Sequence, residues 1–375
     1  MGESVYFYIH IPYCYKKCPY CSFVSYEKKL STVSDYFKAL QNEISSFETD
    51  KTVETIYFGG GTPSLVNVEQ IDKIINLIYK KFKVIKLPEI TIETNPVDAK
   101  YKFLKSIKSI GINRISLGVQ SFIDRKLRTL GRIHNAKISS ESIKNALNVG
   151  FDNISVDLIY GLKETPSEIE YEINSANQFD IRHISTYMLS VEKKTAFYEM
   201  VKNGKIEISK EDEVADAYIY IAELLKNRGF EHYEISNFAK KDFESRHNNA
   251  YWLGYDYRGF GVSASSFVNG ERFSNTDAIE DYIKLIKNKK STIKHRENLS
   301  NLKSMKESFV LLMRLAKGVD INLFNKKYKT DVERVYKDEL EHFIKLGFIK
   351  KENGKISLNG EQSMVVSNSI LSDFV

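Results

Sequence analysis

The alternation of short β-rich segments with helical segments most constrains the fold of this 375-residue chain. Each of six predicted strands is followed by a predicted helix, a pattern typical of parallel βαβ units. Six units, without the two more that would close an eight-fold barrel, predict an α/β fold of the open, partial (β/α)6 TIM-like barrel type. Ser209, with Asp212 three residues later, predicts the N-terminal cap of the last helix. The strands are predicted at 5–11, 53–58, 89–93, 114–118, 153–158 and 183–189, and the helices at 35–47, 68–82, 100–110, 138–149, 168–178 and 210–228.

The pattern changes near residue 291. Apolar periodicity then predicts helices at 303–315 and 333–346. Asn353 and Gly354 lie between two short β-rich segments, 347–349 and 355–358, and predict a small β-hairpin. We therefore expect a barrel core at 1–235, an extension of the core at 236–290, and a mainly helical C-terminal domain at 291–375.

All three cysteines of the chain, Cys14, Cys18 and Cys21, lie in one C-x3-C-x2-C loop after the first predicted strand. An odd number of cysteines rules out complete intramolecular pairing into disulfides and favours a reducing compartment. Three thiolates and His10 could hold zinc, whereas three thiolates alone suit an iron–sulfur cluster with one corner left open. His10 is expected in the strand, on the far side of Pro12, so the spacing favours the cluster.

Glycines and polar residues recur at the ends of the predicted strands. A glycine run at 59–61 follows the second strand, where missing Cβ atoms let the backbone approach a ligand. Glu93 and Asp157 are carboxylates in apolar strands, so they must either pair, with Arg114 as a partner, or bind a polar ligand. Ligand-binding residues of parallel barrels gather at the carboxyl ends of the strands, which favours a ligand site here.

Composition narrows the classes of function. The net charge of +6, from 55 basic and 49 acidic residues, permits anionic ligands but does not indicate nucleic acid as a partner. No segment approaches the roughly 20 apolar residues of a membrane span. The first residues lack the charged and apolar regions of a signal peptide. We expect a soluble, cytoplasmic protein. The residues around His247 leave open whether it ligates a metal or only forms hydrogen bonds in a loop.

These motifs resemble those of the radical SAM superfamily, and in detail its branch of oxygen-independent coproporphyrinogen III oxidases and HemW heme chaperones. The resemblance is carried by the cysteine loop and by five strings, YFGGGTPS at 57–64, RISLGVQSF at 114–122, LGRIH at 130–134, DLIYGL at 157–162 and RHN at 246–248. It implies a [4Fe–4S] cluster on the three cysteines, with S-adenosylmethionine (SAM) at the fourth iron. By matched position the SAM pocket would contain Tyr8, Tyr20, Gly60, Gly61, Thr62, Glu93, Gln120, Arg132 and Asp157.

Three features separate the two classes of the branch. The oxidases resemble this chain but carry a further cysteine two positions after the third, where this chain has Phe23. They also have a longer segment before the cysteines. The string from His247 through Asn248 to Tyr251 is similar to the H-N-x-x-Y signature tied to heme in the chaperones. All three features favour a chaperone that binds heme and passes it to an acceptor hemoprotein.

The alternative that remains open is an oxidase that decarboxylates coproporphyrinogen III. The resemblance does not decide whether SAM is cleaved, and it is compatible with a homodimer and with peripheral contact at a membrane. Two departures from the family pattern occur. Lys163-Glu164-Thr165 stands where Pro-x-Gln-Thr is usual, and Ser22 stands where aspartate is common. Neither departure removes a cluster ligand.

Overall fold

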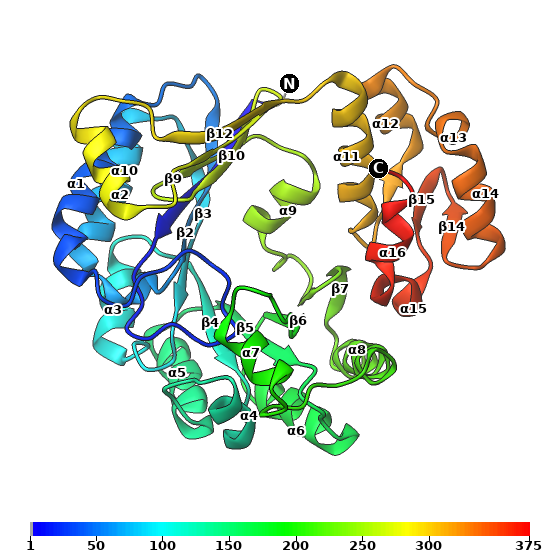
Figure 1. Cartoon of the computed structure of the whole chain (residues 1–375), viewed down its shortest axis with the longest axis horizontal. Coiled ribbons are helices and arrows are strands. Elements are labelled where there is room, and N and C mark those ends of the chain that lie inside the picture. Colours follow the sequence, from blue (N-terminus) through cyan, green and yellow to red (C-terminus); the bar gives the residue numbers. More distant parts are fainter. Residues whose placement is uncertain (1–2) are drawn as a thin grey trace.

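The computed structural model describes residues 3–375, whose strands form one sheet of 12 strands and a second of three (Figure 1). Six parallel strands in sequence order make the barrel, which confirms the predicted α/β fold. They are β1 (Ser4–Ile11), β2 (Thr52–Gly60), β3 (Val84–Thr94), β4 (Arg114–Gln120), β5 (Asn153–Tyr160) and β6 (His183–Met188).

Helices cover the outer face of these strands (Figure 1). Their apolar stripes, such as Ile71, Ile74, Ile75 and Ile78 of α2, are buried against the sheet. Several of these helices begin at side-chain caps; for example, Asn67 caps α2, and Thr165 forms a capping box with Glu168 on α6. The helices of the barrel region are α1 (Val33–Ser46), α2 (Val68–Lys81), α3 (Tyr101–Ser109), α4 (Asp124–Thr129), α5 (Ala136–Val149), α6 (Pro166–Asn177), α7 (Ala196–Lys202) and α8 (Glu211–Lys226), and 3-10 turns occur at Leu30–Thr32 and Pro63–Leu65.

The barrel stays open because both of its edge strands pair with segments from the extension. On one side β6 pairs with β8 (Asn237–Ala239), which pairs with β7 (Glu231–Glu234). On the other side β1 pairs in parallel with β9 (Tyr257–Phe260). The sheet continues through β10 (Ser265–Val268), β11 (Glu271–Asn275) and β12 (Ile293–Asn298), with α9 (Arg246–Trp252) and α10 (Ile279–Lys287) between the strands.

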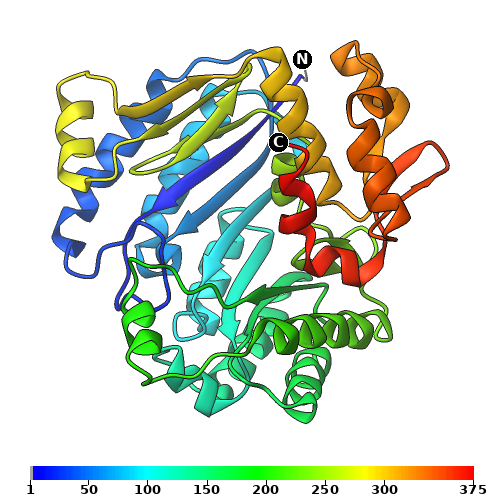
Figure 2. The ribbon, with the colours of Figure 1, turned by 45° about the vertical axis from the view of Figure 1, so that its right-hand side comes forward.

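The C-terminal helices lie beside α9, on the other side of the sheet from α1 and α2 (Figures 1 and 2). Here α11 contacts α9 and α15 contacts α8. The predicted hairpin around Asn353 is present and is joined by a third short strand. This region comprises α11 (Asn301–Met313), β13 (Val319–Asp320), α12 (Ile321–Tyr328), α13 (Val332–Val335), α14 (Lys337–Lys345), β14 (Ile349–Glu352), β15 (Lys355–Leu358), α15 (Gly360–Val365) and α16 (Ser367–Ser372).

The structure corrects two local predictions. Ser209 does not cap α8, because that helix begins at Glu211 and the N–H of Lys210 donates to the Glu213 carboxylate at 2.8 Å. The Ser209 hydroxyl instead accepts a hydrogen bond from the N–H of Lys163. The single helix predicted at 333–346 is two helices, separated at Tyr336, whose φ of −112° is not helical. The division at 235 and 290 remains a prediction; β12, just beyond it, still belongs to the large sheet.

Candidate functional site

A cavity of about 430 Å³ opens at the carboxyl ends of the barrel strands and extends down to the start of β4. Its wall contains side chains from the cysteine loop, from β2 to β6 and from α9. Of the residues predicted for the site, those in the wall are Cys14, Cys18, Tyr20, Cys21, Gly60, Gly61, Thr62, Glu93, Gln120, Arg132, Asp157 and Asn248. Tyr8, His247 and Tyr251 do not line it, and Tyr8 and His247 pack against Tyr57, which does.

The cysteine loop is held against the end of β2 by backbone hydrogen bonds. The N–H of Gly61 donates to the carbonyl of Ile11 at 2.8 Å, and that of Thr62 donates to the carbonyl of Tyr13 at 2.7 Å. A Cβ at Gly61 would lie 2.7 Å from the Tyr13 carbonyl oxygen, closer than packing allows. Glycine at this position therefore allows the close approach that sets the loop, whereas approach of the glycine run to a ligand remains a prediction.

Hydrogen-bond donors face two of the three sulfurs. Nη1 of Arg132 donates to Sγ of Cys18 at 3.2 Å, and Oγ1 of Thr62 donates to Sγ of Cys14 at 3.6 Å. Burial raises the pKa of the Cys21 thiol, and nearby Lys17 opposes that rise. Donors to sulfur stabilise thiolate ligands, so the loop is suited to a metal–thiolate group.

The arrangement does not offer His10 as a fourth ligand beside the three cysteines. Both of its ring nitrogens are engaged, because Nε2 bonds the Val24 carbonyl at 3.0 Å and Nδ1 bonds the hydroxyl of Tyr8 at 3.2 Å. Three thiols around one cavity wall suit a cluster whose separate irons each take one sulfur.

Two half-buried carboxylates, Glu93 and Asp157, line the cavity. Glu93 accepts from the hydroxyl of Tyr57 at 2.9 Å and from the N–H of Gly60 at 3.0 Å. Burial raises the pKa of Glu93 to about 7, against the opposing effect of these two donors. Asp157 accepts from the Ser116 hydroxyl at 2.9 Å, and burial raises its pKa as well. Buried carboxylates with spare acceptor capacity favour a ligand that carries positive charge.

Arg132 connects the cysteine loop with the end of β4. Its Nη2 donates to Oδ1 of Asn95 at 2.6 Å and to the carbonyl of Gly118 at 2.9 Å. Gln120, the last residue of β4, has a φ of +67°, which costs energy for a non-glycine residue and bends the strand end at a register shift. This bend places the Gln120 side chain in the cavity wall.

His247, which is buried, and Tyr251, which is partly buried, lie outside the cavity wall and contact β2 through Thr55 and Tyr57. Nδ1 of His247 bonds Oγ1 of Thr55 at 2.6 Å, and Nε2 bonds the hydroxyl of Tyr251 at 2.9 Å. Its ring also stacks on that of Tyr57, with centroids 4.8 Å apart and planes 25° apart. Burial lowers the pKa of His247 to about 3, so the ring is neutral. Only Asn248 of this string faces the cavity.

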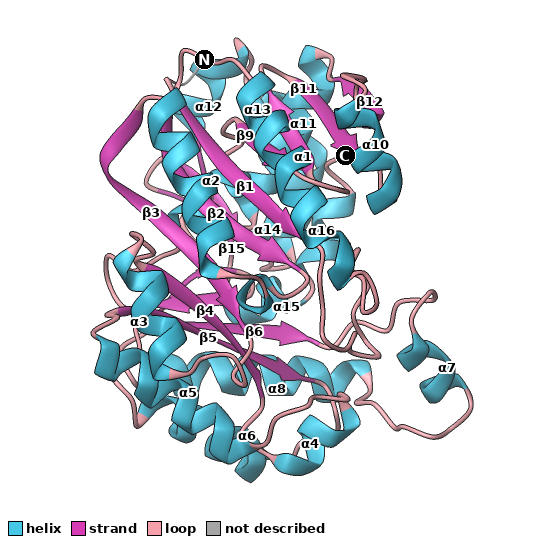
Figure 3. Cartoon of the chain, turned by 90° about the vertical axis from the view of Figure 1, so that its left-hand side faces the viewer, coloured by secondary structure: helices cyan, strands magenta, loops and turns pink. Residues whose placement is uncertain are grey.

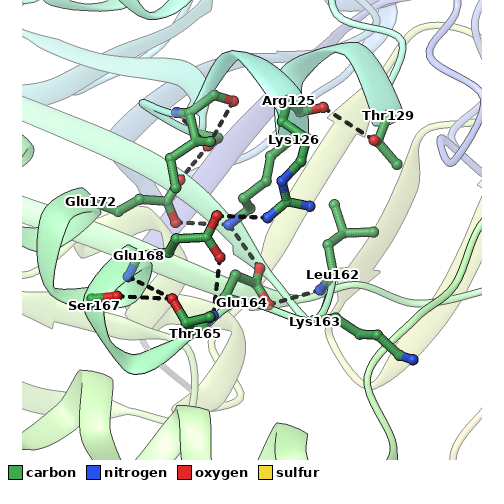
Figure 4. A network of polar contacts seen from close by, with 12 residues as sticks. Arg125, Lys126, Thr129, Leu162, Lys163, Glu164, Thr165, Ser167, Glu168 and Glu172 are labelled. Carbon is green, nitrogen blue, oxygen red and sulfur yellow. Dashed lines mark hydrogen bonds and ion pairs between the residues drawn. The ribbon is translucent and has the colours of Figure 1, made fainter.

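Sequence reasoning missed a buried ionic network beneath the end of β5 (Figure 4). Nζ of Lys126 lies 2.7 Å from carboxylate oxygens of both Glu164 and Glu172, and it donates to the Ile159 carbonyl at 3.0 Å. The Lys126 side chain is fully buried. Glu164 also accepts from the N–H groups of Gly161 and Leu162. The signal in the sequence was Glu164 itself, one of the residues where the chain departs from the family pattern.

The structure also places β6 in the cavity wall, through Ser185, Tyr187 and Met188. The segment from β6 to α8, which carries α7, extends beyond the arrowheads of the barrel strands (Figure 3). It touches the cysteine loop where the N–H of Phe197 donates to the Pro19 carbonyl at 3.0 Å. None of these residues was predicted, because an isolated serine or methionine near a strand end carries no pattern.

Comparison with known proteins gives consistent matches. The family model "Radical SAM superfamily" matches residues 8–176, and "HemN C-terminal domain" matches residues 299–361. The chain is 34% identical to heme chaperone HemW of Bacillus subtilis, covering 98% of both chains. It is 31% identical to heme chaperone HemW of Lactococcus lactis, covering 98% of this chain and 96% of the relative. The solved structure of coproporphyrinogen III oxidase (HemN) from Escherichia coli, a radical SAM enzyme, has a TM-score of 0.85 at 20% identity, covering 99% of this chain and 89% of that one.

Proposed function

The chain belongs to the HemW family of heme chaperones within the radical SAM superfamily, and we propose that it binds heme and transfers it to an acceptor hemoprotein. Similarity over nearly the full length of chaperones from two species carries this proposal. Phe23 supports it, because an apolar ring that is 68% exposed occupies the cavity rim where the oxidases have a further cysteine. An exposed phenylalanine beside a cavity suits contact with a flat, apolar ligand.

Cys14, Cys18 and Cys21 would hold the [4Fe–4S] cluster, and the cavity below them would hold SAM. When bound, this pair supplies one-electron reductive chemistry. Arg132 donates to the Cys18 sulfur and would stabilise the charge of the ligated thiolate. Glu93 and Asp157 present two acceptors to the cavity, where they would face the positively charged sulfonium and ammonium groups of SAM.

We also propose that His247 ligates the heme iron, which requires a local rearrangement of the structure. Both ring nitrogens of His247 are hydrogen-bonded, and its side chain is buried. An iron atom can take a ring nitrogen only if the bond to Thr55 or Tyr251 breaks. Asn248 already faces the cavity. We therefore propose that α9 shifts when heme binds.

Anaerobic reconstitution with iron and sulfide, followed by heme titration, tests this function. The wild type should bind heme and His247→Ala should bind it more weakly. No heme binding by the wild type would refute the chaperone function. Transfer is tested separately by incubating the heme-loaded protein with an apo-cytochrome and measuring the Soret band of the acceptor.

An oxidase remains the second candidate, because the fold matches that of the E. coli oxidase along most of both chains. The reconstituted protein should be assayed anaerobically with coproporphyrinogen III, SAM and a strong reductant. Sustained formation of protoporphyrinogen would replace the chaperone proposal by the oxidase. We expect none.

The proposal also covers the cellular location of the protein, its oligomeric state and its contact with a membrane. No helix among residues 3–375 is long and apolar enough to cross a membrane. We propose a cytoplasmic protein, because reduced thiols are needed to hold the cluster. A homodimer and peripheral contact with a membrane-bound acceptor are also proposed, and sedimentation of the protein with and without its cluster tests the former.

A further inference from the structure

We propose that His247 is a positioning residue of the SAM pocket, which acts on Glu93 through Tyr57. The string that predicts heme binding would then also set the affinity for SAM. This inference rests on the proposed function, since it requires that the cavity binds SAM. It rests equally on three contacts that join α9, β2 and β3.

The first contact is between Tyr57 and Glu93. Tyr57 lines the cavity, and its hydroxyl donates to Oε1 of Glu93 at 2.9 Å. The second carboxylate oxygen accepts from the N–H of Gly60. These two neutral donors define the orientation of the Glu93 carboxylate. Removing the Tyr57 hydroxyl would leave one of its oxygens without a fixed partner.

The second contact is the stack of His247 on Tyr57. Tyr57 lines the cavity whereas His247 does not, and their rings stack with centroids 4.8 Å apart. Tyr8 also packs against both rings, at 6.0 Å from Tyr57 and 6.4 Å from His247. Tyr57 thus borders the cavity and packs against His247 and Tyr8, so the loss of the nearer ring, His247, would weaken the packing that fixes its position.

The third set of contacts fixes His247. Thr55 and Tyr57 are two residues apart on β2, so their side chains lie on the same face of the strand. The His247 ring can therefore form a hydrogen bond with Thr55 and stack on Tyr57 at the same time. Tyr251 holds the other ring nitrogen, and Glu89 accepts from the backbone N–H of His247 at 3.0 Å. Three contacts hold the ring and a fourth holds its backbone N–H, and the ring does not line the cavity.

Changing His247 should consequently alter ligand affinity without disturbing the cysteines. In His247→Ala the Tyr57 ring loses its support, and the Glu93 carboxylate loses its fixed orientation. We expect the Kd for SAM to rise about tenfold, the scale of one weakened hydrogen bond to a charged group. The cluster absorbance should be unchanged, because none of these residues contacts a cysteine of the loop.

Four variants of the reconstituted full-length protein test the inference, with SAM and heme titrated separately into each. His247→Ala should bind both ligands more weakly. His247→Phe retains an aromatic ring behind Tyr57 but no ligating nitrogen, so it should keep its SAM affinity and lose heme affinity. Tyr57→Phe retains the stack but loses the hydroxyl, so it should lose SAM affinity and keep heme affinity. Tyr79→Phe, at a half-exposed tyrosine of α2, is the matched control.

Wild-type SAM affinity in either His247→Ala or Tyr57→Phe would overturn the inference, as would loss of SAM affinity in His247→Phe. Should the alanine variant not fold, the two phenylalanine variants still decide between these outcomes. Failure of the wild type to bind heme would refute the chaperone function, but the SAM affinities of the variants could still be compared. Failure of the chaperone function is therefore distinguishable from failure of the proposed role of His247 in SAM binding.

Discussion

The guanidinium of Arg132 donates to the sulfur of Cys18 from 114 residues away in the chain, at 3.2 Å. This contact places a positive charge directly on a predicted cluster ligand. Donors to cluster sulfurs favour the reduced, more negative state, so they raise the reduction potential. We expect Arg132→Met to shift the cluster to a more negative midpoint potential, measured by a redox titration followed by electron paramagnetic resonance. An unchanged potential would show that the charge is screened from the cluster.

The close approach of Gly61 to the cysteine loop leads to a second prediction. In Gly61→Ala the new Cβ would meet backbone atoms of Tyr13 and Ile11 at 2.7–3.0 Å, so the loop must move. We expect the reconstituted variant to hold less than half the iron of the wild type, measured by iron and sulfide analysis. Gly204→Ala is the control, because its Cβ would meet no atom within 4 Å. Its positive φ of 67° will cost stability but should not cost iron.

SAM binding should depend on pH through Glu93. Burial raises the pKa of this carboxyl to about 7, so it is increasingly protonated, and neutral, as the pH falls below that value. A cationic ligand prefers the ionised form. The Kd for SAM should therefore rise as the pH falls from 8 to 6. Uptake of a single proton limits this rise to about tenfold per pH unit.

Histidines at the site do not complicate this profile. Burial lowers the pKa of His10 to about 4 and that of His247 to about 3, so neither changes charge between pH 6 and 8. Burial also raises the pKa of Asp157, and it can add to the slope. Glu93→Gln should bind SAM weakly with a flatter profile, and a wild-type slope in this variant would exclude Glu93 as the titrating group.

The Lys126 network should matter strongly for stability. Lys126→Met leaves Glu164 and Glu172 buried without their cation, which we expect to lower the free energy of unfolding by about 3–5 kcal/mol. Neutralising both carboxylates in the triple variant with Glu164→Gln and Glu172→Gln should restore much of the loss. Urea denaturation measures the free energy of unfolding of the wild type, of Lys126→Met and of the triple variant. Lys137→Met, at an exposed ion pair with Glu141, is the matched control and should show no measurable change.

Heme and SAM should weaken each other's binding. If heme iron takes a nitrogen of His247, the ring must leave Thr55 or Tyr251, and the support behind Tyr57 is lost. The Kd for SAM should then be higher in the heme-loaded protein, and SAM must raise the Kd for heme by the same factor. Equilibrium dialysis with each ligand in turn measures both factors. Equal affinities with and without heme would place the heme away from His247.

The barrel could be predicted because its signals are local. Each of β1 to β6 is an apolar segment bounded by turn residues, and glycine runs and isolated carboxylates such as Glu93 stand out within such segments. The strands β9 to β12 were missed because they have only four to six residues and show no regular alternation of buried and exposed positions. Their place in the sheet is set by pairing with distant strands.

The environment of His247 could not be predicted for a similar reason. Sequence shows that His247 and Tyr251 are one helical turn apart, and the structure confirms that they contact each other. It does not show that Thr55, 192 residues earlier, takes the other nitrogen. Lys126 was missed because a single lysine in a six-residue helix gives no sign of burial.

The parallel pairing of β1 with β9 has a consequence for synthesis on the ribosome. One edge of β1 can pair as soon as β2 has been synthesised, about 50 residues later. The other edge can pair only after β9, Tyr257–Phe260, has been synthesised. At roughly 5–20 residues per second, that edge stays unpaired for on the order of 10–50 seconds. An apolar strand with free backbone groups is prone to aggregate during this time. Slow translation or a truncated message ending before residue 257 should therefore yield insoluble protein even though all six barrel strands have been made.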